Sequence, residues 1–216
     1  MTFEVLSIIL LNIVFSFRGF NDFIFFEKFQ FKIEKIKNRE YYRFLTSGFL
    51  HVDKQHLLFN MVTLYFFGDF VLNFFSSFWF FFIYAFCLMS GSIFCFFIHQ
   101  NNNIFSAVGA SGAVTGILFS AILSYPDLKL ALLFLPIPIP GYIFGIAYLA
   151  YTFYGIKKQN DGIGHSAHLG GAIGGIVLSI ILMPKLIILS YKTLILLSIV
   201  IILGIIYFRK SIYRSN

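Results

Sequence analysis

The stretch Gly109-Ala110-Ser111-Gly112 opens one very apolar segment, and Ala167-His168-Leu169-Gly170-Gly171 opens a later one. Each stretch places one polar side chain, a hydroxyl or an imidazole, at the end of a segment apolar enough to cross a membrane. A serine hydroxyl is a poor nucleophile at neutral pH, and hydrogen bonding to an imidazole makes it reactive. If the two segments are neighbouring helices, they bring a nucleophile and its base together.

The composition indicates a polytopic membrane protein. Of 216 residues, 59% are hydrophobic, 20% are aromatic and only 12% are charged, which is far from the composition of a soluble globule. The formal charge of +7 lies between the apolar segments and at the C-terminus rather than in a stripe, so a nucleic-acid partner is excluded. Cys87 and Cys95 share one apolar run, where they act as small apolar side chains.

Seven apolar segments predict seven membrane helices, because each is near the length of about 20 residues that a bilayer-spanning helix needs. They cover roughly residues 3–17, 56–72, 78–98, 108–124, 141–156, 167–183 and 186–208. The first carries Glu4, lacks a small-x-small cleavage signature and precedes further membrane segments, so it predicts a helix rather than a cleaved signal peptide. The fold class is therefore an all-α, polytopic transmembrane helical bundle.

The segments between these helices carry turn residues. Breaks are predicted at 73–77, 100–103, 126–127, 136–141, 157–164 and 184–185. The three prolines of the 136–141 run predict a loop that enters the fifth helix. Residues 18–43 mix charged and apolar side chains, so we expect this loop to lie partly embedded at the membrane surface. With these crossings, His51, Ser111 and His168 lie next to loops on the same side of the membrane.

Glycines accompany both polar side chains. Ser111 lies between Gly109 and Gly112, with Gly116 one turn beyond, and this small-residue face lets another helix approach closely. Taken alone, the stretch is better explained as a packing motif than as a catalytic one. It is not the strand-to-helix elbow of soluble hydrolases, because Ala113 replaces the last glycine and no strand precedes it.

His168 is followed on its own face by Gly171 and Gly175, which again permits a close helix contact. Its alternative role is to cap or hydrogen-bond its own helix. The occurrence of both motifs in one chain favours the pairing with Ser111.

His51, His56 and Asn60 form a third group, and His56 and Asn60 project from one face of a helix. With the backbone N–H of Ser111, they could stabilise the oxygen anion of a tetrahedral intermediate. The competing interpretation is a metal site formed by His51, His56, His165 and His168. It is weakened by the absence of a His-Glu-x-x-His motif and of a carboxylate near Ser111 or His168.

At this point the chain resembles the rhomboid family of intramembrane serine proteases, bacterial type, over residues 41–176. The resemblance rests on Tyr42-Arg43, then His51, His56 and Asn60, then Gly109-x-Ser111-Gly112, then Ala167-His168-x-x-Gly171-x-x-x-Gly175, in the family's order. It implies Ser111 as nucleophile and His168 as general base, without an acidic third member. It also implies oxyanion donors at His56, Asn60 and the Ser111 backbone N–H, with His51, Gly109 and Gly112 in support.

Three positions depart from the family pattern. Tyr42 stands where a tryptophan is frequent, and Leu72 stands where an acidic residue is frequent, with Asp69 nearby. Thr115 stands where some members have a tyrosine packed under the histidine, which leaves open how the His168 ring is held. The rival base His165 is interpreted as a loop residue at the membrane edge.

The resemblance implies a protease that cleaves transmembrane proteins in or beside their membrane-spanning segments, in the lipid bilayer and without a cofactor or metal. Residues 1–183 would form a six-helix core, and residues 184–216 an additional C-terminal helix and basic tail. The expected location is a bacterial inner membrane with the site facing the extracytoplasmic side, although counting positive charges favours the opposite orientation. The alternatives are a non-catalytic rhomboid-like protein that binds membrane clients, and a transporter, for which no inverted repeat is visible.

Overall fold

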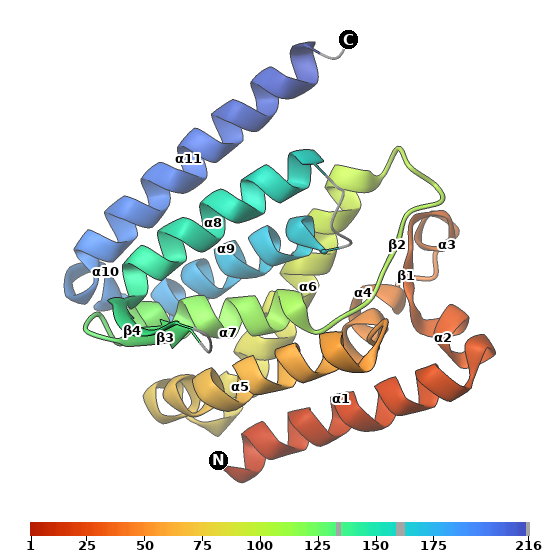
Figure 1. Ribbon diagram of the computed structural model, residues 1–216, viewed down its shortest axis with the longest axis horizontal. Coiled ribbons are helices and arrows are strands. Elements are labelled where there is room, and N and C mark those ends of the chain that lie inside the picture. The colour runs from red at the N-terminus through yellow and green to blue at the C-terminus, as the bar shows by residue number, and fades with distance from the viewer. Residues whose placement is uncertain (133–134, 159–162, 215–216) are drawn as a thin grey trace.

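The structure, a computed structural model, describes residues 1–132, 135–158 and 163–214 and is a bundle of helices (Figure 1). Within these residues a long helix lies at each of the seven predicted segments. These helices are α1 (Phe3–Asn21), α5 (Lys54–Phe75), α6 (Ser77–His99), α7 (Ser111–Ser124), α8 (Gly141–Lys158), α9 (His165–Leu182) and α11 (Tyr191–Arg214). The predicted all-α bundle is confirmed.

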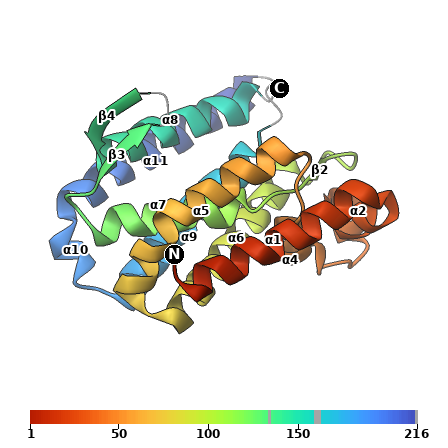
Figure 2. The same ribbon diagram turned by 60° about the horizontal axis from the view of Figure 1, so that its bottom comes forward.

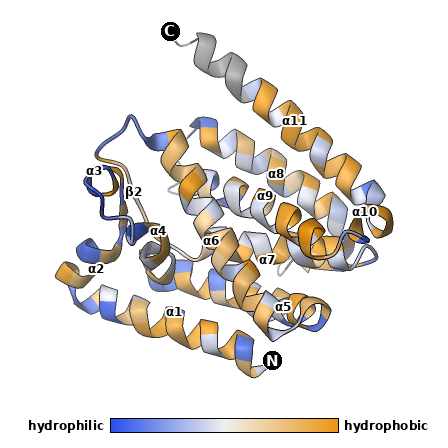
Figure 3. Ribbon diagram, turned by 180° about the vertical axis from the view of Figure 1, so that it is seen from behind, coloured by the Kyte–Doolittle hydropathy of each residue, from blue (hydrophilic) through white to orange (hydrophobic). Residues whose placement is uncertain are grey.

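Four of the helices in the described chain, α1, α5, α6 and α9, are long and apolar enough to cross a membrane. Two further apolar helical stretches, Ser111–Ser124 and Tyr191–Tyr207, are shorter. Hydrophobic residues predominate along these helices, as Figure 3 shows in orange, and many of their large side chains are exposed. The chain is therefore a multi-pass membrane protein.

α7 is the central helix and is shorter than predicted. It has 14 residues, and every one after Ser111 is buried. Its neighbours are α5, α6 and α9 (Figures 1 and 2). At about 1.5 Å per residue it rises about 21 Å, less than the hydrocarbon core of about 30 Å. Because protein surrounds α7, its length is not set by contact with lipid, and the sequence rule for length overestimated it.

The first loop folds into short elements at one end of the bundle. These are α2 (Phe23–Phe29), α3 (Ile33–Lys37), α4 (Arg43–Thr46) and the 3-10 turn η1 (Ser47–Phe49). Strand β1 (Phe31–Lys32) pairs antiparallel with β2 (Ser106–Ala107), which lies just before α7. The expectation that no strand precedes Ser111 is therefore wrong, since this two-residue strand leads into the turn at Gly109. Hydrophilic residues gather at this end (Figure 3). The chain therefore enters α7 from the more polar end of the bundle.

The predicted loop at 136–141 is wrong. Residues Leu135–Pro140 form strand β4, which pairs antiparallel with β3 (Lys129–Leu132), and Leu130 is opposite Ile139. An edge strand tolerates prolines at alternate positions, because the nitrogens of alternate residues point away from its partner. The proline spacing of this run therefore suits a strand as well as a loop.

The other predicted breaks are found with small shifts. The turns at 100–103, 126–127 and 184–185 are confirmed. α5 continues to Phe75, and the chain turns at Ser76, whose φ is 85°. α8 continues to Lys158, and residues 159–162 of the break predicted at 157–164 lie outside the described residues.

The predicted segment 186–208 is two helices, α10 (Leu186–Leu189) and α11. Between them the Ser190 hydroxyl donates to the carbonyl oxygen of Leu123 at 2.5 Å, which ties the start of α11 to the end of α7. α11 then runs along α8 (Figure 1), where Lys157 donates to the Tyr207 hydroxyl at 3.0 Å. The last segment therefore packs against the bundle rather than standing apart from it.

Candidate active site

Ser111 is the first residue of α7, and a tight turn leads the chain into it. Gly109 has φ +131°, a conformation that side chains rarely adopt, and its N–H donates to the carbonyl oxygen of Ser47 at 3.0 Å. Ala110 precedes the helix and is fully buried. Ser111 itself is half-buried. The serine therefore lies at the helix N-terminus, held from the side of η1.

Glycines bring the starts of α7 and α9 into backbone contact. A Cβ at Gly112 would lie 3.3 Å from the carbonyl oxygen of Ala167. A Cβ at Gly171 would overlap the backbone of Gly112, and one turn further a Cβ at Gly175 would overlap the backbone of Gly116. Since residues 112 and 167 adjoin Ser111 and His168, the nucleophile and base candidates lie at the same end of two touching helices.

α6 closes this contact from a third side. A Cβ at Gly91 would lie 2.7 Å from the Ala167 carbonyl oxygen and 3.3 Å from the Cα of Gly112. Three helices thus meet where only glycine fits. The position of Ser111 relative to His168 is therefore determined by backbone packing rather than by flexible side chains.

His168 is half-buried, and its ring is held by α8. The Tyr148 hydroxyl lies 3.0 Å from Nδ1 of His168, and the two rings stack with centroids 6.0 Å apart at 25°. The same hydroxyl lies 3.0 Å from Oγ1 of Thr115 on α7. When Nδ1 carries the ring hydrogen and donates it to the Tyr148 hydroxyl, Nε2 is the nitrogen that can accept a proton from a serine.

His51 holds the residue before the serine. Its Nε2 accepts the backbone N–H of Ala110 at 3.4 Å, so Nδ1 carries the ring hydrogen and donates to the Ser16 hydroxyl at 2.8 Å. Ser16 in turn donates to the carbonyl oxygen of Phe49 at 3.0 Å. Burial, and less strongly His56, lowers the pKa of His51 to about 3, so the ring is neutral at pH 7. His51 therefore supports the turn as a neutral acceptor.

From α5, His56 contacts the turn before Ser111, while Asn60 bonds its own helix. The His56 ring packs on Gly109, where a Cβ would lie 2.7 Å from its Cε1, and its centroid is 4.9 Å from that of His51. Asn60 is buried, and its side-chain amide donates to the carbonyl oxygen of His56 at 3.0 Å. His56 thus lies beside the turn into Ser111, and Asn60 lies one helical turn deeper.

Comparison with known proteins assigns the chain to a family. The family model described as the rhomboid domain matches residues 38–185, more than half of the chain. The chain belongs to the rhomboid family. It is 29% identical over 185 residues to "RHOMBOID-like protein 12, mitochondrial" of Arabidopsis thaliana, covering 78% of this chain and 55% of that protein. It is 28% identical over 134 residues to "Rhomboid protein 1, mitochondrial" of Saccharomyces cerevisiae, covering 61% and 39%.

The chain spans about half the length of these curated relatives or less. Both relatives have mitochondrial names, so the comparisons do not support the bacterial origin and bacterial inner membrane expected above. What the comparisons establish is membership in the rhomboid family, through the rhomboid domain at residues 38–185.

The rhomboid motif residue Arg43 ties the first loop together. Its buried guanidinium donates to the carbonyl oxygens of Glu27 and Gln30 at 2.8 and 2.7 Å, and to the carboxylate of Glu40. Tyr42 beside it is exposed and donates to the same carboxylate at 2.8 Å. The pair therefore holds the loop that lies before η1.

The interpretation of His165 as a loop residue at the membrane edge is wrong. His165 is the first residue of α9 and is 3% exposed. Its ring lies against the backbone of Gly155 and edge-on to Tyr151, both on α8, and is 6.0 Å from the His168 ring. Because Gly155 has no side chain, α8 makes room for a buried imidazole here. His165 thus packs toward α8, while His168 lies on the site.

Tyr148 and Ser16 escaped prediction from the sequence. Tyr148 is one of 12 tyrosines, and no spacing rule links it to His168. The available signal was indirect, since Thr115 left the support of the ring unassigned. Ser16 lies on α1, 35 positions before its partner His51. Its segment was interpreted only as an apolar membrane helix, which assigns no role to a single serine.

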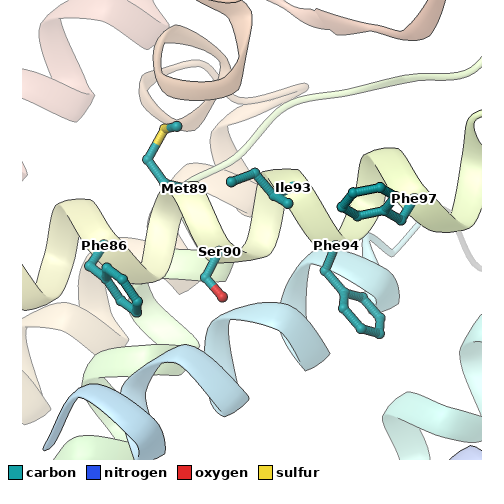
Figure 4. Close-up of a pocket in the computed structure, with 6 residues that line it drawn as sticks. All are labelled: Phe86, Met89, Ser90, Ile93, Phe94 and Phe97. Atoms are coloured by element: carbon teal, nitrogen blue, oxygen red, sulfur yellow. The ribbon is translucent and has the colours of Figure 1, made fainter. Parts of the chain in front are cut away.

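Two other possible sites can be compared with this one. Within the described residues, no three His, Cys, Asp or Glu side chains lie close enough to hold a metal ion. A hollow of about 370 Å³ lies along α6 (Figure 4). Six residues line it: Phe86, Met89, Ser90, Ile93, Phe94 and Phe97. Its one hydroxyl, that of Ser90, donates to the carbonyl oxygen of Gly170 at 2.7 Å, so the hollow is an apolar surface feature.

Proposed function

We propose that this rhomboid is an intramembrane serine protease in which Ser111 is the nucleophile and His168 the general base. The observation that carries the proposal is the glycine contact between α7 and α9, which brings both residues to one end of the bundle. The 3.0 Å contact between Nδ1 of His168 and the Tyr148 hydroxyl supports it, because an Nδ1–H that donates to this hydroxyl makes Nε2 the proton acceptor of the ring. Its substrates are transmembrane proteins, cut within or beside their membrane-spanning segments.

The reaction follows from these groups. The Ser111 oxygen attacks the carbonyl carbon of the scissile peptide bond while its proton moves to Nε2 of His168. His168 then gives that proton to the leaving nitrogen, and the C–N bond breaks. Water attacks the resulting ester with the same base, which releases the second product and restores Ser111. No cofactor or metal is needed for these steps.

Water and substrate must both reach the start of α7. In this proposal Ser111 lies below the membrane surface, which the shortness of α7 relative to the membrane core allows, at the end where Figure 3 shows the hydrophilic residues. A substrate helix hides its carbonyl groups in its own hydrogen bonds, so it must unwind locally to be attacked. Residues 1–183 form the core of this proposal, and residues 184–216 add α10 and α11. With α1 entering from the cytoplasmic side, the site opens on the extracytoplasmic side.

Replacing Ser111 with alanine is expected to reduce cleavage of a single-span substrate in liposomes to background without changing the unfolding temperature. The matched control is Ser120→Ala on the same helix, which removes a hydroxyl that donates to the carbonyl oxygen of Gly175 at 3.3 Å, far from the site. That variant should retain most activity. Cleavage that survives Ser111→Ala contradicts the proposal, and a wild type that binds the substrate without cutting it favours the non-catalytic alternative.

The oxyanion donors in this proposal are the His56 ring, the Asn60 amide and the Ser111 backbone N–H. We expect His56→Ala and Asn60→Ala each to lower kcat by about 10²–10³-fold with little change in KM, because the donors act on charge that develops in the transition state. Thr63→Ala on the same helix is the control, since its hydroxyl donates only to the carbonyl oxygen of Phe59 at 2.8 Å and is exposed. Unchanged kcat in both site variants contradicts the assignment.

A further inference from the structure

We infer that Tyr148 on α8, together with Thr115, is the positioning pair for the general base. This inference rests on the proposed function, since it concerns how His168 is made ready. Three observations support it. The Tyr148 hydroxyl lies 3.0 Å from Nδ1 of His168 and 3.0 Å from Oγ1 of Thr115, and the Tyr148 ring stacks on the imidazole.

The direction of each hydrogen bond from His168 through Tyr148 to Thr115 follows from the role of the base. For Nε2 to accept the serine proton, Nδ1 must carry the ring hydrogen and donate it to the phenol oxygen of Tyr148. The phenol O–H then has Thr115 Oγ1 as its acceptor. The imidazolium formed during attack keeps the same contact. Tyr148 thus selects the reactive tautomer and fixes the ring, as an acidic residue does in a three-residue site.

The ring of Tyr148 is itself held firmly. It stacks with Phe144 at a centroid distance of 5.9 Å and meets Phe119 edge-on at 6.0 Å. Phe119 lies on α7 and Phe144 on α8, so the phenol is clamped by the helices it connects. A hydroxyl held in this way loses little freedom when it binds His168, which makes the hydrogen bond effective.

Thr115 lies one turn after Ser111 on α7 and is 4% exposed. Its side chain is too short to pack under the imidazole, and the aromatic ring comes instead from α8. The consequence is that the dyad depends on a third helix. α8 is in turn packed by α11, where a Cβ at Gly145 would lie 3.2 Å from the Leu197 side chain. Through α8, helix α11 therefore also supports the site.

The test compares Tyr148→Phe, Thr115→Val, Thr115→Ser and the double variant Tyr148→Phe/Thr115→Val. Tyr148→Phe keeps the ring and removes the hydroxyl, so we expect kcat to fall about 10- to 100-fold, as for loss of a hydrogen bond to a charged group, with KM nearly unchanged. The kcat of Thr115→Val should fall less, and the kcat of Thr115→Ser should stay near that of the wild type. The double variant should equal Tyr148→Phe alone, because Thr115 acts only through Tyr148.

Tyr125→Phe is the matched control, since its hydroxyl donates to the carbonyl oxygen of Phe70 at 3.2 Å, away from His168. It should leave kcat unchanged. The inference is overturned if kcat is unchanged in Tyr148→Phe, or if the losses of kcat are additive in the double variant. In either case the proposed function stands as long as cleavage still requires Ser111. If Tyr148→Phe fails to fold, the contrast between Thr115→Val and Thr115→Ser decides, and equal kcat in those two overturns it. Cleavage that survives Ser111→Ala is the separate outcome that refutes the proposed function.

Discussion

Replacing His168 with alanine is expected to lower kcat by about 10²–10⁴-fold, the usual contribution of a general base. The KM should change little, because the imidazole acts on the proton of Ser111 rather than on the substrate helix. The measurement is the rate of cleavage at saturating substrate in liposomes, with the unfolding temperature as a check on the fold.

His165 provides the control for this result, since it is a second imidazole on the same helix. It packs against Gly155 and Tyr151 of α8 rather than toward α7. His165→Gln keeps most of the buried volume and should retain most of the wild-type kcat. The assignment of the base is wrong if His168→Ala retains the wild-type kcat. It is also wrong if His165→Gln folds normally and its kcat falls as far as that of His168→Ala.

Replacing Gly171 with alanine is expected to reduce both stability and turnover. The added Cβ would overlap the carbonyl group of Gly112, which is backbone and cannot rotate away. The helices must then separate, at a cost of about 1–3 kcal/mol for overpacking. A displacement of about 1 Å between reacting groups can lower turnover about 10²-fold. We expect a lower unfolding temperature in detergent and a loss of cleavage of that order.

Gly164→Ala is the matched control, because Gly164 precedes the first residue of the same helix. Among the residues that the structure describes, its Cβ would meet only the side chain of Ala167, at 4.0 Å, and its φ of −75° suits alanine. This variant should behave like the wild type. Wild-type turnover in Gly171→Ala would show that the close contact between α7 and α9 is not what positions the dyad.

The sequence was sufficient to predict the helices, and the glycine faces that meet beside Ser111 and His168, for a physical reason. Long apolar segments report the membrane directly, and glycines spaced by four report the helix faces that can touch, as Gly112 with Gly171 and Gly116 with Gly175 do. The order of the motifs then identified the family, which the comparisons confirm.

The features that escaped prediction depend on tertiary placement. A length rule for membrane helices cannot recognise a short helix surrounded by protein, such as α7. Prolines at alternate positions of 135–140 read as a loop until β3 is seen beside them. The partners Tyr148 and Ser16 come from helices whose rotation about their own axes is set by packing, so no pattern within α8 or α1 reveals them.

The most direct test of the proposed dyad is to treat the protein with a fluorophosphonate in liposomes and to map the adduct by mass spectrometry. An activated serine oxygen displaces fluoride from phosphorus, so the label marks the nucleophile rather than its supports. Our account predicts an adduct on Ser111 that forms in wild type and forms far more slowly in His168→Ala. A protein that cleaves its substrate while Ser111 stays unlabelled and another serine carries the adduct would contradict it.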